Sequence, residues 1–424
     1  MLFDPLGTGL MIGKRIAQLW RSSVDYYFSD KESRGCILGM KKWKLKRTAL
    51  SLFLSVWFLQ ALSSPACASA QTPADAIALD QEGKLPEAAQ AWRAVIQKNP
   101  NDAAALASLG VVLSKEQKYK EAASAYEKAI ALNPKLPGVQ LNLGLAEFKQ
   151  GDFRAAIAPL RAASIADPHN PQASTLLGLS YYGAKRFEEA IKYLDPAAKS
   201  DPSNAELHQV LAQSCLWAKK YSCALGEFQQ ILQQNPNSAA AHMLNGEALD
   251  GLGRTPEAIA EFQAAVKVSP QEPNVHFGLG YLYWKSQQFD EAKREFESEL
   301  SVEPNHPLAL TYLGDIEMQR SNPDGAISLL RKAVQVKHDI RLAYVDLGSI
   351  FTQQKQYKDA IIALQRAVEL DPAYPDAHYR LGRVYQAMGN EAQSKKEFAK
   401  VRELHQKADS LASKMSAAPP PLPQ

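Results

Sequence analysis

Four histidines recur at a fixed spacing and are the residues that most readily suggest metal chemistry. His208, His242 and His276 lie 34 residues apart, and His378 falls further along the same series. If each step is one unit of a stack, equivalent histidines lie about 10 Å apart. Zinc ligands must converge within about 2 Å of one ion. We therefore interpret the four histidines as packing residues and predict no metal site.

Other side chains that could carry out catalysis lack a suitable sequence context. The repeated region contains no HExxH, GxSxG, GxxxxGK[ST] or CxxC motif. Glu257, Glu291 and Asp359 recur where second helices are expected to begin, and the helix dipole favours acidic residues there. No stretch outside the repeats is long enough for a catalytic domain. We predict a protein that is not an enzyme and binds no cofactor.

Two cysteines, Cys215 and Cys223, fall near the end of one expected helix and the start of its antiparallel partner. Two interpretations of this pair remain open. The pair could form a disulfide, which an exported compartment would permit and which depends on geometry. Alternatively, Cys215 could stay reduced and pack as a small apolar residue.

The histidines belong to a chain whose residue types recur every 34 residues. Three series follow this spacing without insertion or deletion over roughly 300 residues, as is typical of stacked supersecondary units. The proline series is interrupted by His338 and the glycine series by Ala212. The members are Pro100, Pro134, Pro168, Pro202, Pro236, Pro270, Pro304 and Pro372; Gly110, Gly144, Gly178, Gly246, Gly280, Gly314, Gly348 and Gly382; and Ala88, Ala122, Ala156, Ala190, Ala224, Ala258, Ala292, Ala326 and Ala360.

A single repeat, counted from Ala103 as position 1, predicts two amphipathic helices. Apolar residues recur at helical spacing on either side of a break at Gln117 and Lys118. Gly110 and Ala122 lack bulk and would let the two helices approach closely. A proline at position 32 would end the second helix. Prolines at position 1 are expected to begin the first helix of the next repeat; these are Pro137, Pro171, Pro273, Pro307 and Pro375. Residues that favour the N-cap precede position 1 in several repeats; these are Asp102, Asn170, Asn204 and Ser238.

This pattern resembles the tetratricopeptide repeat. The shared residues are Leu at position 7, Gly at 8, an aromatic at 11, Ala at 20, an aromatic at 24, Ala at 27 and Pro at 32. His276 to Pro304 is a close match. The resemblance covers about Thr72 to Leu404 in ten copies, and it implies an all-α, right-handed superhelical solenoid of helix–turn–helix units.

Charge separates the first 70 residues from the rest. They contain ten basic and four acidic residues. The whole chain contains 48 basic and 45 acidic residues and has a net charge of +3. The remaining 38 basic and 41 acidic residues give the repeats and tail a net charge of −3. A near-neutral body lacks the basic footprint of a nucleic-acid-binding protein, so we predict no nucleic-acid partner.

Residues 40–70 have the order of a secretory signal peptide. Five basic residues after Met40 precede an apolar stretch over 49–62, and the small-residue triplet Ala68-Ser69-Ala70 follows. The stretch is shorter than the about 20 apolar residues that span a bilayer. We predict cleavage after Ala70 and export. An uncleaved anchor, or lipidation of Cys67 despite Ser64 three residues earlier, is the alternative that would give a membrane association.

These boundaries give five segments. Residues 1–39 carry no assignable pattern and could precede the true start at Met40. Residues 40–70 are the predicted signal peptide, 71–404 the ten repeats, 405–415 a capping extension of the last helix and 416–424 a proline-rich, disordered tail. The extension is expected because Ser394 and Gln406 replace the repeat's Ala and Pro. Proteins that resemble this one often serve as assembly scaffolds in bacterial envelopes, so we expect the periplasm or cell envelope of a bacterium.

In proteins with this repeat, positions 2, 5, 9, 12 and 13 line a concave groove. Here these positions predict a partner-binding surface that is largely apolar and aromatic. Its candidate residues are Leu141, Leu145, Phe148, Leu179, Tyr182, Leu216, Trp217, Met243, Phe277, Tyr281, Trp284, Met318, Tyr379 and Arg383.

The resemblance implies a scaffold that binds a protein or peptide, and the sequence does not identify that partner. The subfamily that clamps acidic tails is excluded because only Asn142 matches its early positions, and Arg380 and Arg383 lack their partners. Two alternatives remain: a regulatory or substrate-presenting subunit of an envelope enzyme or secretion complex, and a self-associating structural array.

Overall fold

A computed structural model describes residues 72–416 of the chain, and every described element is an α-helix. The segments 1–71 and 417–424, which hold the predicted signal peptide and most of the predicted tail, lie outside the described residues. The helices form two compact units, residues 72–227 and 228–416, whose boundary falls inside α11. The fold is an all-α solenoid, as predicted.

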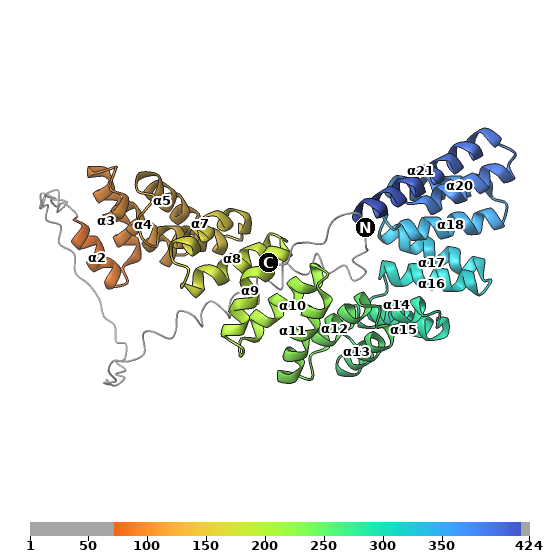
Figure 1. The fold of residues 1–424 in the computed structure, drawn as a ribbon, viewed down its shortest axis with the longest axis horizontal. Helices are drawn as coiled ribbons and strands as arrows, with labels where there is room; N and C mark the ends of the chain where they lie inside the picture. Colours follow the sequence, from red (N-terminus) through yellow and green to blue (C-terminus); the bar gives the residue numbers. More distant parts are fainter. Residues whose placement is uncertain (1–71, 417–424) are drawn as a thin grey trace, which may run out of the picture. The chain divides into compact units, whose positions relative to one another are not determined.

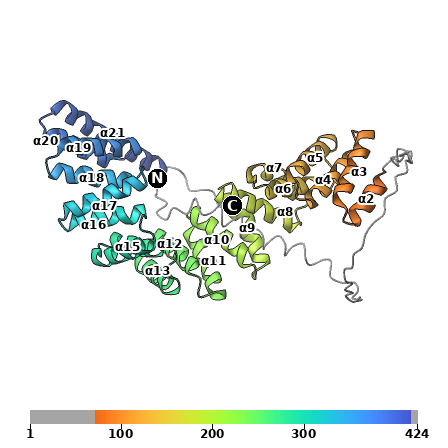
Figure 2. The same cartoon turned by 180° about the vertical axis from the view of Figure 1, so that it is seen from behind.

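Each repeat consists of two helices, and each helix of a unit packs against the helix that follows it in the chain (Figures 1 and 2). We call the even-numbered helices first helices and the odd-numbered ones second helices. The first unit contains α2 (Pro73–Gln81), α3 (Leu85–Lys98), α4 (Ala103–Lys115), α5 (Tyr119–Leu132), α6 (Val139–Lys149), α7 (Phe153–Ala166), α8 (Pro171–Gly183), α9 (Phe187–Ser200) and α10 (Ala205–Trp217).

The helix α11 (Tyr221–Gln234) crosses the boundary between the units. The second unit continues with α12 (Ala239–Gly251), α13 (Thr255–Val268), α14 (Val275–Lys285), α15 (Phe289–Val302), α16 (Pro307–Gln319), α17 (Pro323–Val336), α18 (Arg341–Gln353), α19 (Tyr357–Leu370), α20 (Pro375–Ala387) and α21 (Glu391–Ser416).

A close contact between position 8 and position 24 holds each helix pair together. In eight repeats position 8 is glycine, and a Cβ atom added there would lie 2.4–2.8 Å from the large side chain at position 24 of the same repeat. Gly110 faces Tyr126 and Gly280 faces Phe296 in this way. The glycine therefore serves close packing, as the sequence predicted.

The turn inside each repeat closes the helix pair with the same hydrogen bonds. In α4, the amide of Lys118 donates to the carbonyl of Leu113, and the amide of Gln117 donates to that of Ser114. This Schellman arrangement requires a left-handed residue after the helix. Position 15 has a positive φ in every repeat, although only some repeats place glycine there. Gln117, at φ 61°, adopts this conformation despite its side chain.

Two first helices begin later than predicted. Pro137 and Pro273 were expected at the first helical position, but α6 begins at Val139 and α14 at Val275. Gly138 and Asn274 precede these helices in the left-handed conformation, with φ of 75° and 68°. The start moves because a left-handed residue cannot belong to a right-handed helix. Pro171, Pro307 and Pro375 do begin α8, α16 and α20.

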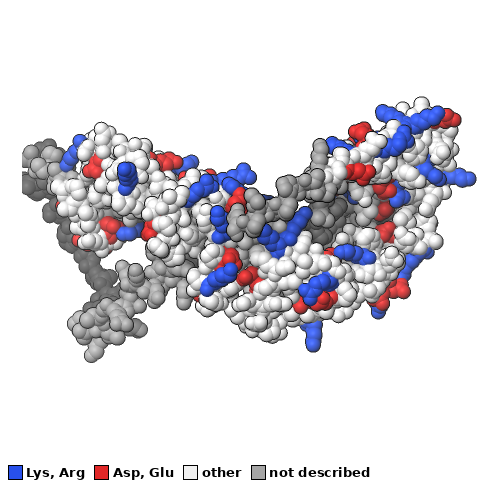
Figure 3. Space-filling model, viewed as in Figure 1, with Lys and Arg blue, Asp and Glu red and all other residues white. Residues whose placement is uncertain are grey.

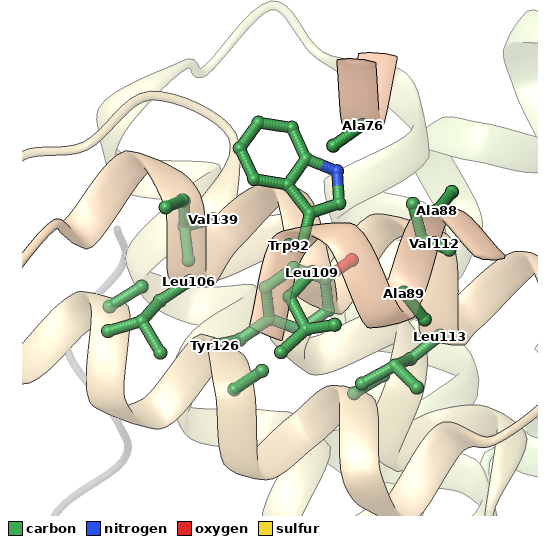
Figure 4. Close-up of a cluster of buried hydrophobic side chains, with 14 of the residues drawn as sticks. Ala76, Ala88, Ala89, Trp92, Leu106, Leu109, Val112, Leu113, Tyr126 and Val139 are labelled. Atoms are coloured by element: carbon green, nitrogen blue, oxygen red, sulfur yellow. The ribbon is translucent and has the colours of Figure 1, made fainter. Parts of the chain in front are cut away.

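The core follows the interfaces between first and second helices. Near the start of the described chain, Trp92 and Tyr126 lie among Leu106, Leu109 and Leu113 (Figure 4). Ala88 and Ala122, at position 20 of their repeats, are fully buried. Small residues at this position admit the neighbouring large side chains, which explains why alanine recurs there.

A glycine-to-alanine pair tests this packing within one unit. In Gly178→Ala, the new Cβ would lie 2.8 Å from Leu194 Cδ2, so we expect a loss of about 1–3 kcal/mol in the free energy of unfolding. In Gly226→Ala, nothing lies within 4 Å of the new Cβ, so the better helix propensity of alanine should add about 0.5–1 kcal/mol. Urea denaturation measures both; equal effects would contradict the packing role.

Candidate partner-binding site

The predicted groove residues divide into three groups by burial, and only two of the groups can contact a partner. Four are buried: Phe148, Leu216, Met243 and Phe277. Eight are half-buried: Leu141, Leu145, Leu179, Tyr182, Trp217, Tyr281, Trp284 and Met318. Two are exposed: Tyr379 and Arg383.

The four buried residues pack between helices, so they do not contribute to an exposed groove surface. Phe277 shows why: its ring lies 5.9 Å from Phe296, 4.8 Å from His306 and 6.0 Å from Tyr312, measured between ring centroids. The side chain therefore fills the space between its own repeat and the next. The candidates are divided between the two units.

In the first unit, the first-helix face carries one aromatic group. Tyr182 stacks on Trp217 with centroids 5.7 Å apart, and Phe187 lies 4.9 Å from Trp217. The Tyr182 hydroxyl donates to Oε1 of Gln213 at 2.5 Å, and burial raises the pKa of Tyr182. The hydroxyl therefore stays protonated and already has an acceptor, which fixes the ring in place.

The disulfide joins α10 to α11 beside this group. Cys215 and Cys223 are bonded in the structure, with their Cα atoms 5.8 Å apart. Of the two readings that the sequence left open, the structure therefore contains the bridge. It crosses the turn that follows Trp217 and connects the two helices of that repeat.

In the second unit, three aromatic rings form the corresponding group. Tyr281 stacks on Trp284 with centroids 6.1 Å apart, and Tyr312 meets both edge-on, at 5.6 Å and 4.8 Å. The indole Nε1 of Trp284 donates to Oδ2 of Asp315 at 2.7 Å. Tyr312 is buried and supports the half-buried Tyr281 and Trp284. We call Tyr281, Trp284 and Tyr312 the aromatic triad.

Tyr312 and Asp315 are not among the groove residues predicted from the sequence. Tyr312 lies at position 6, which is not one of the predicted groove positions, and Asp315 lies at position 9 but is not apolar. The 34-residue spacing could have found both residues, since it carries Tyr312, Asp346 and Arg380 along position 6 of three successive first helices.

Comparison with known proteins adds the family. Sequence models described as "TPR repeat" match residues 112–151, 246–287 and 348–389, and models described as "Tetratricopeptide repeat" match 141–205, 181–248, 277–340 and 376–408. Together these matches cover more than half of the chain. The chain belongs to the tetratricopeptide repeat family. No curated protein sequence matches it.

Several solved structures are similar to parts of the chain at low sequence identity. YrrB, described as a TPR protein with an unusual peptide-binding site, is 20% identical over 44% of this chain and 97% of its own, with a TM-score of 0.36. The Cut9–Hcn1 complex of the APC/C is 14% identical over 78% and 80%, with a TM-score of 0.47. A repeat protein from Parabacteroides merdae is 19% identical over 58% and 97%, with a TM-score of 0.48.

Tetratricopeptide repeats generally serve as scaffolds for protein–protein interaction, and such folds are typically non-catalytic. On the face shown in Figure 3, Lys and Arg are interspersed with Asp and Glu over both units. None of the described helices has the length and apolar character needed to cross a membrane.

The four histidines of the repeat bind glutamates of the same helix pair. Nδ1 of His208, His242, His276 and His378 lies 2.5–2.6 Å from a carboxylate oxygen of Glu227, Glu261, Glu295 and Glu397, in that order. The two residues occur together at positions 4 and 23. The other repeats from residue 103 on have neither, as in Leu310 and Leu329. The histidines therefore join the two helices of a repeat.

One further group has the composition of a metal site but serves as a helix cap. Among the described residues, ligand atoms of Glu299, Glu303 and His306 come within 4.8 Å of one another. The Glu299 carboxylate accepts the amides of Asn274 and Phe277 at 3.0 Å, at the start of α14. His306 Nδ1 accepts the Ala309 amide at the start of α16, and burial lowers the pKa of His306 to about 4.

An acidic side chain in the first unit is strongly perturbed. Burial, together with the charges of Glu127 and Asp152, raises the pKa of Glu147 to about 7. Its Oε2 atom is buried and accepts no hydrogen bond from residues 72–416. Above pH 7 the folded state must therefore hold a charged carboxylate that the unfolded chain solvates better.

The His276–Glu295 pair can be tested by copying the next repeat. His276→Leu should lower the free energy of unfolding by about 1–3 kcal/mol, because Glu295 loses its partner. The double variant His276→Leu/Glu295→Leu reproduces the side chains of Leu310 and Leu329, so it should lose less than the two single variants together. Urea denaturation at neutral pH measures all three; additive losses would show that the pair is uncoupled.

Glu147→Gln should stabilise the first unit in a pH-dependent way. A raised pKa destabilises the folded state as pH rises from about 4.5 through about 7. The substitution should therefore add about 1–3 kcal/mol above pH 8 and little near pH 4. Urea denaturation at both pH values measures the difference. The exposed Glu188→Gln is the control, and a similar gain from both variants would contradict this account.

Proposed function

We propose that this protein is an exported, non-catalytic scaffold that binds an extended segment of a partner protein on the first-helix faces of its repeats. The observation that carries the proposal is the aromatic triad of the second unit. Tyr281 and Trp284 are half-exposed, although large apolar side chains surround them on α14 and α16. The basic, apolar and small-residue order of residues 40–70 supports export.

The triad has the properties of an interaction anchor. Aromatic side chains bury a large area and lose little conformational entropy, so they dominate the affinity of many interfaces. The Asp315 hydrogen bond and the Tyr312 ring hold Trp284 in one orientation before any partner binds. A preorganised surface binds more tightly, because less freedom is lost on association.

Partner capture by the chain lacking residues 1–70 tests the proposal. Wild type and the variant Tyr281→Ala/Trp284→Ala would be immobilised and exposed to envelope extract, and bound proteins identified by mass spectrometry. We expect a defined partner on the wild type and at least a roughly tenfold weaker recovery on the variant, since anchor residues contribute about 2 kcal/mol or more each. Phe277 is not changed, because its fully buried ring supports the fold.

Ile362→Ala is the matched control, since Ile362 is 66% exposed on the second helix α19. It should capture the partner as the wild type does. Equal recovery by the aromatic double variant would contradict the proposal. Light scattering over a range of concentrations separates the alternative of a self-associating array, which predicts a mass that rises with concentration.

A further inference from the structure

Asp346 of α18 is a buried carboxylate without a hydrogen bond to any of residues 72–416. Its side chain is 4% exposed, and its Oδ2 atom is fully enclosed. Burial and the like charge of Asp315 raise the pKa of Asp346 well above its usual value. An unpaired polar group in such a place costs stability, so its presence requires a reason.

The nearest cations do not pair with Asp346, because each is already held elsewhere. Arg341 lies over the ring of Tyr374, with Cζ 3.7 Å from the centroid, and faces Asp371. Arg380 donates through Nε to Asp376 at 3.0 Å and through Nη1 to the Ser349 hydroxyl at 2.6 Å. Their charges oppose the effects of burial and of Asp315 on the Asp346 pKa without reversing it.

The fold itself does not require an acid at this position. Asp346 occupies position 6 of its repeat, where α8, α10 and α12 have Leu176, Val210 and Leu244, and the flanking α16 and α20 have Tyr312 and Arg380. An apolar side chain would fill the same place without the cost of an unpaired carboxylate. The acid is therefore better explained by something that binds to it than by packing.

Asp315 connects this carboxylate to the aromatic triad. It lies on α16, between Trp284 of α14 and Asp346 of α18 in the order of the first helices. Its Oδ2 atom accepts the Trp284 indole, while its Oδ1 atom has no hydrogen-bond partner among residues 72–416. Two carboxylates beside three aromatic rings suit a cation with an apolar stem, since both charge and ring faces attract it.

We propose that the second unit binds a lysine or arginine side chain of the partner segment, with its cationic group between Asp315 and Asp346 and its stem against the aromatic triad. This inference rests on the proposed function, whose binding face it shares. Charge complementarity selects the occupant. Binding an acidic segment would require an unpaired Lys or Arg side chain on this face. Arg380 already donates hydrogen bonds to Asp376 and Ser349.

Selection of short random peptides from a displayed library tests the inference. The baits are the chain lacking residues 1–70, its variants Asp346→Asn and Asp346→Leu, and the control Asp339→Asn at an exposed surface acid. We expect peptides selected on the wild type and the control to be enriched in Lys or Arg. Both Asp346 variants should lose this enrichment and keep the apolar preference that depends on Tyr281 and Trp284.

A synthetic copy of a selected peptide gives the quantitative test. Replacing its Lys or Arg by norleucine keeps an apolar stem and removes the charge. This change should weaken binding roughly tenfold to the wild type and leave binding to Asp346→Leu unchanged, because charge-assisted hydrogen bonds are lost only in the first case. Asp346→Leu should also shift the urea midpoint upward, which shows that it remains folded.

The outcomes separate this inference from the function on which it rests. Peptides that bind through Tyr281 and Trp284 but show no cationic preference, or that are acidic, would overturn the inference alone. An unchanged cationic preference on both Asp346 variants would overturn it as well. If no peptide is selected, or if Tyr281→Ala/Trp284→Ala selects the same peptides as the wild type, the inference and the proposed function both fail.

Discussion

The close approach of two helices within each repeat is the constraint on which the rest of the structure depends. Glycine at position 8 lets the large side chain at position 24 come so near that a single Cβ atom would overlap it. Where glycine is present, an added methyl group would force the facing side chain to move, whereas two repeats accommodate a buried alanine, Ala76 or Ala212, at this position. The helix pair is therefore one closely packed unit. Its repetition without insertion explains why proline, glycine and alanine keep one spacing through the chain.

Positions outside this contact can vary, and they vary in two ways. From residue 103 on, His at position 4 and Glu at position 23 occur only together, because each contacts the other across the helix pair, and Leu310 and Leu329 replace both in one repeat. Positions 6 and 9 change independently and give α16 and α18 their unusual acids. The first kind of variation preserves an internal interface. The second alters a face of the first helices and is where binding specificity can arise.

The sequence was sufficient to predict the parts of the fold that depend on local residue type. Position 8, the N-caps Asp102 and Ser238 and the helix alternation all follow from spacing and propensity. The late start of α14 did not, since it depends on a left-handed Asn274 and on Glu299 of the next helix. Burial of Phe277 was also missed, because position in a repeat gives the direction of a side chain but not which neighbours cover it. Tyr312 and Asp346 can be recognised as candidate site residues only when successive first helices are placed beside each other.

Two buried acids of the second unit differ in whether the fold supplies hydrogen-bond partners for them. Burial raises the pKa of both Glu299 and Asp346. Glu299 accepts two backbone amides at the start of α14, which would otherwise lack partners, so the fold explains its charge. Asp346 accepts none from the described residues, and its neighbouring arginines are held by other groups. A stack of repeats can carry such a cost, since stability is a sum over repeats and their interfaces. One weakened repeat is supported by those beside it, and this allows an unpaired carboxylate to persist inside a packed helix face.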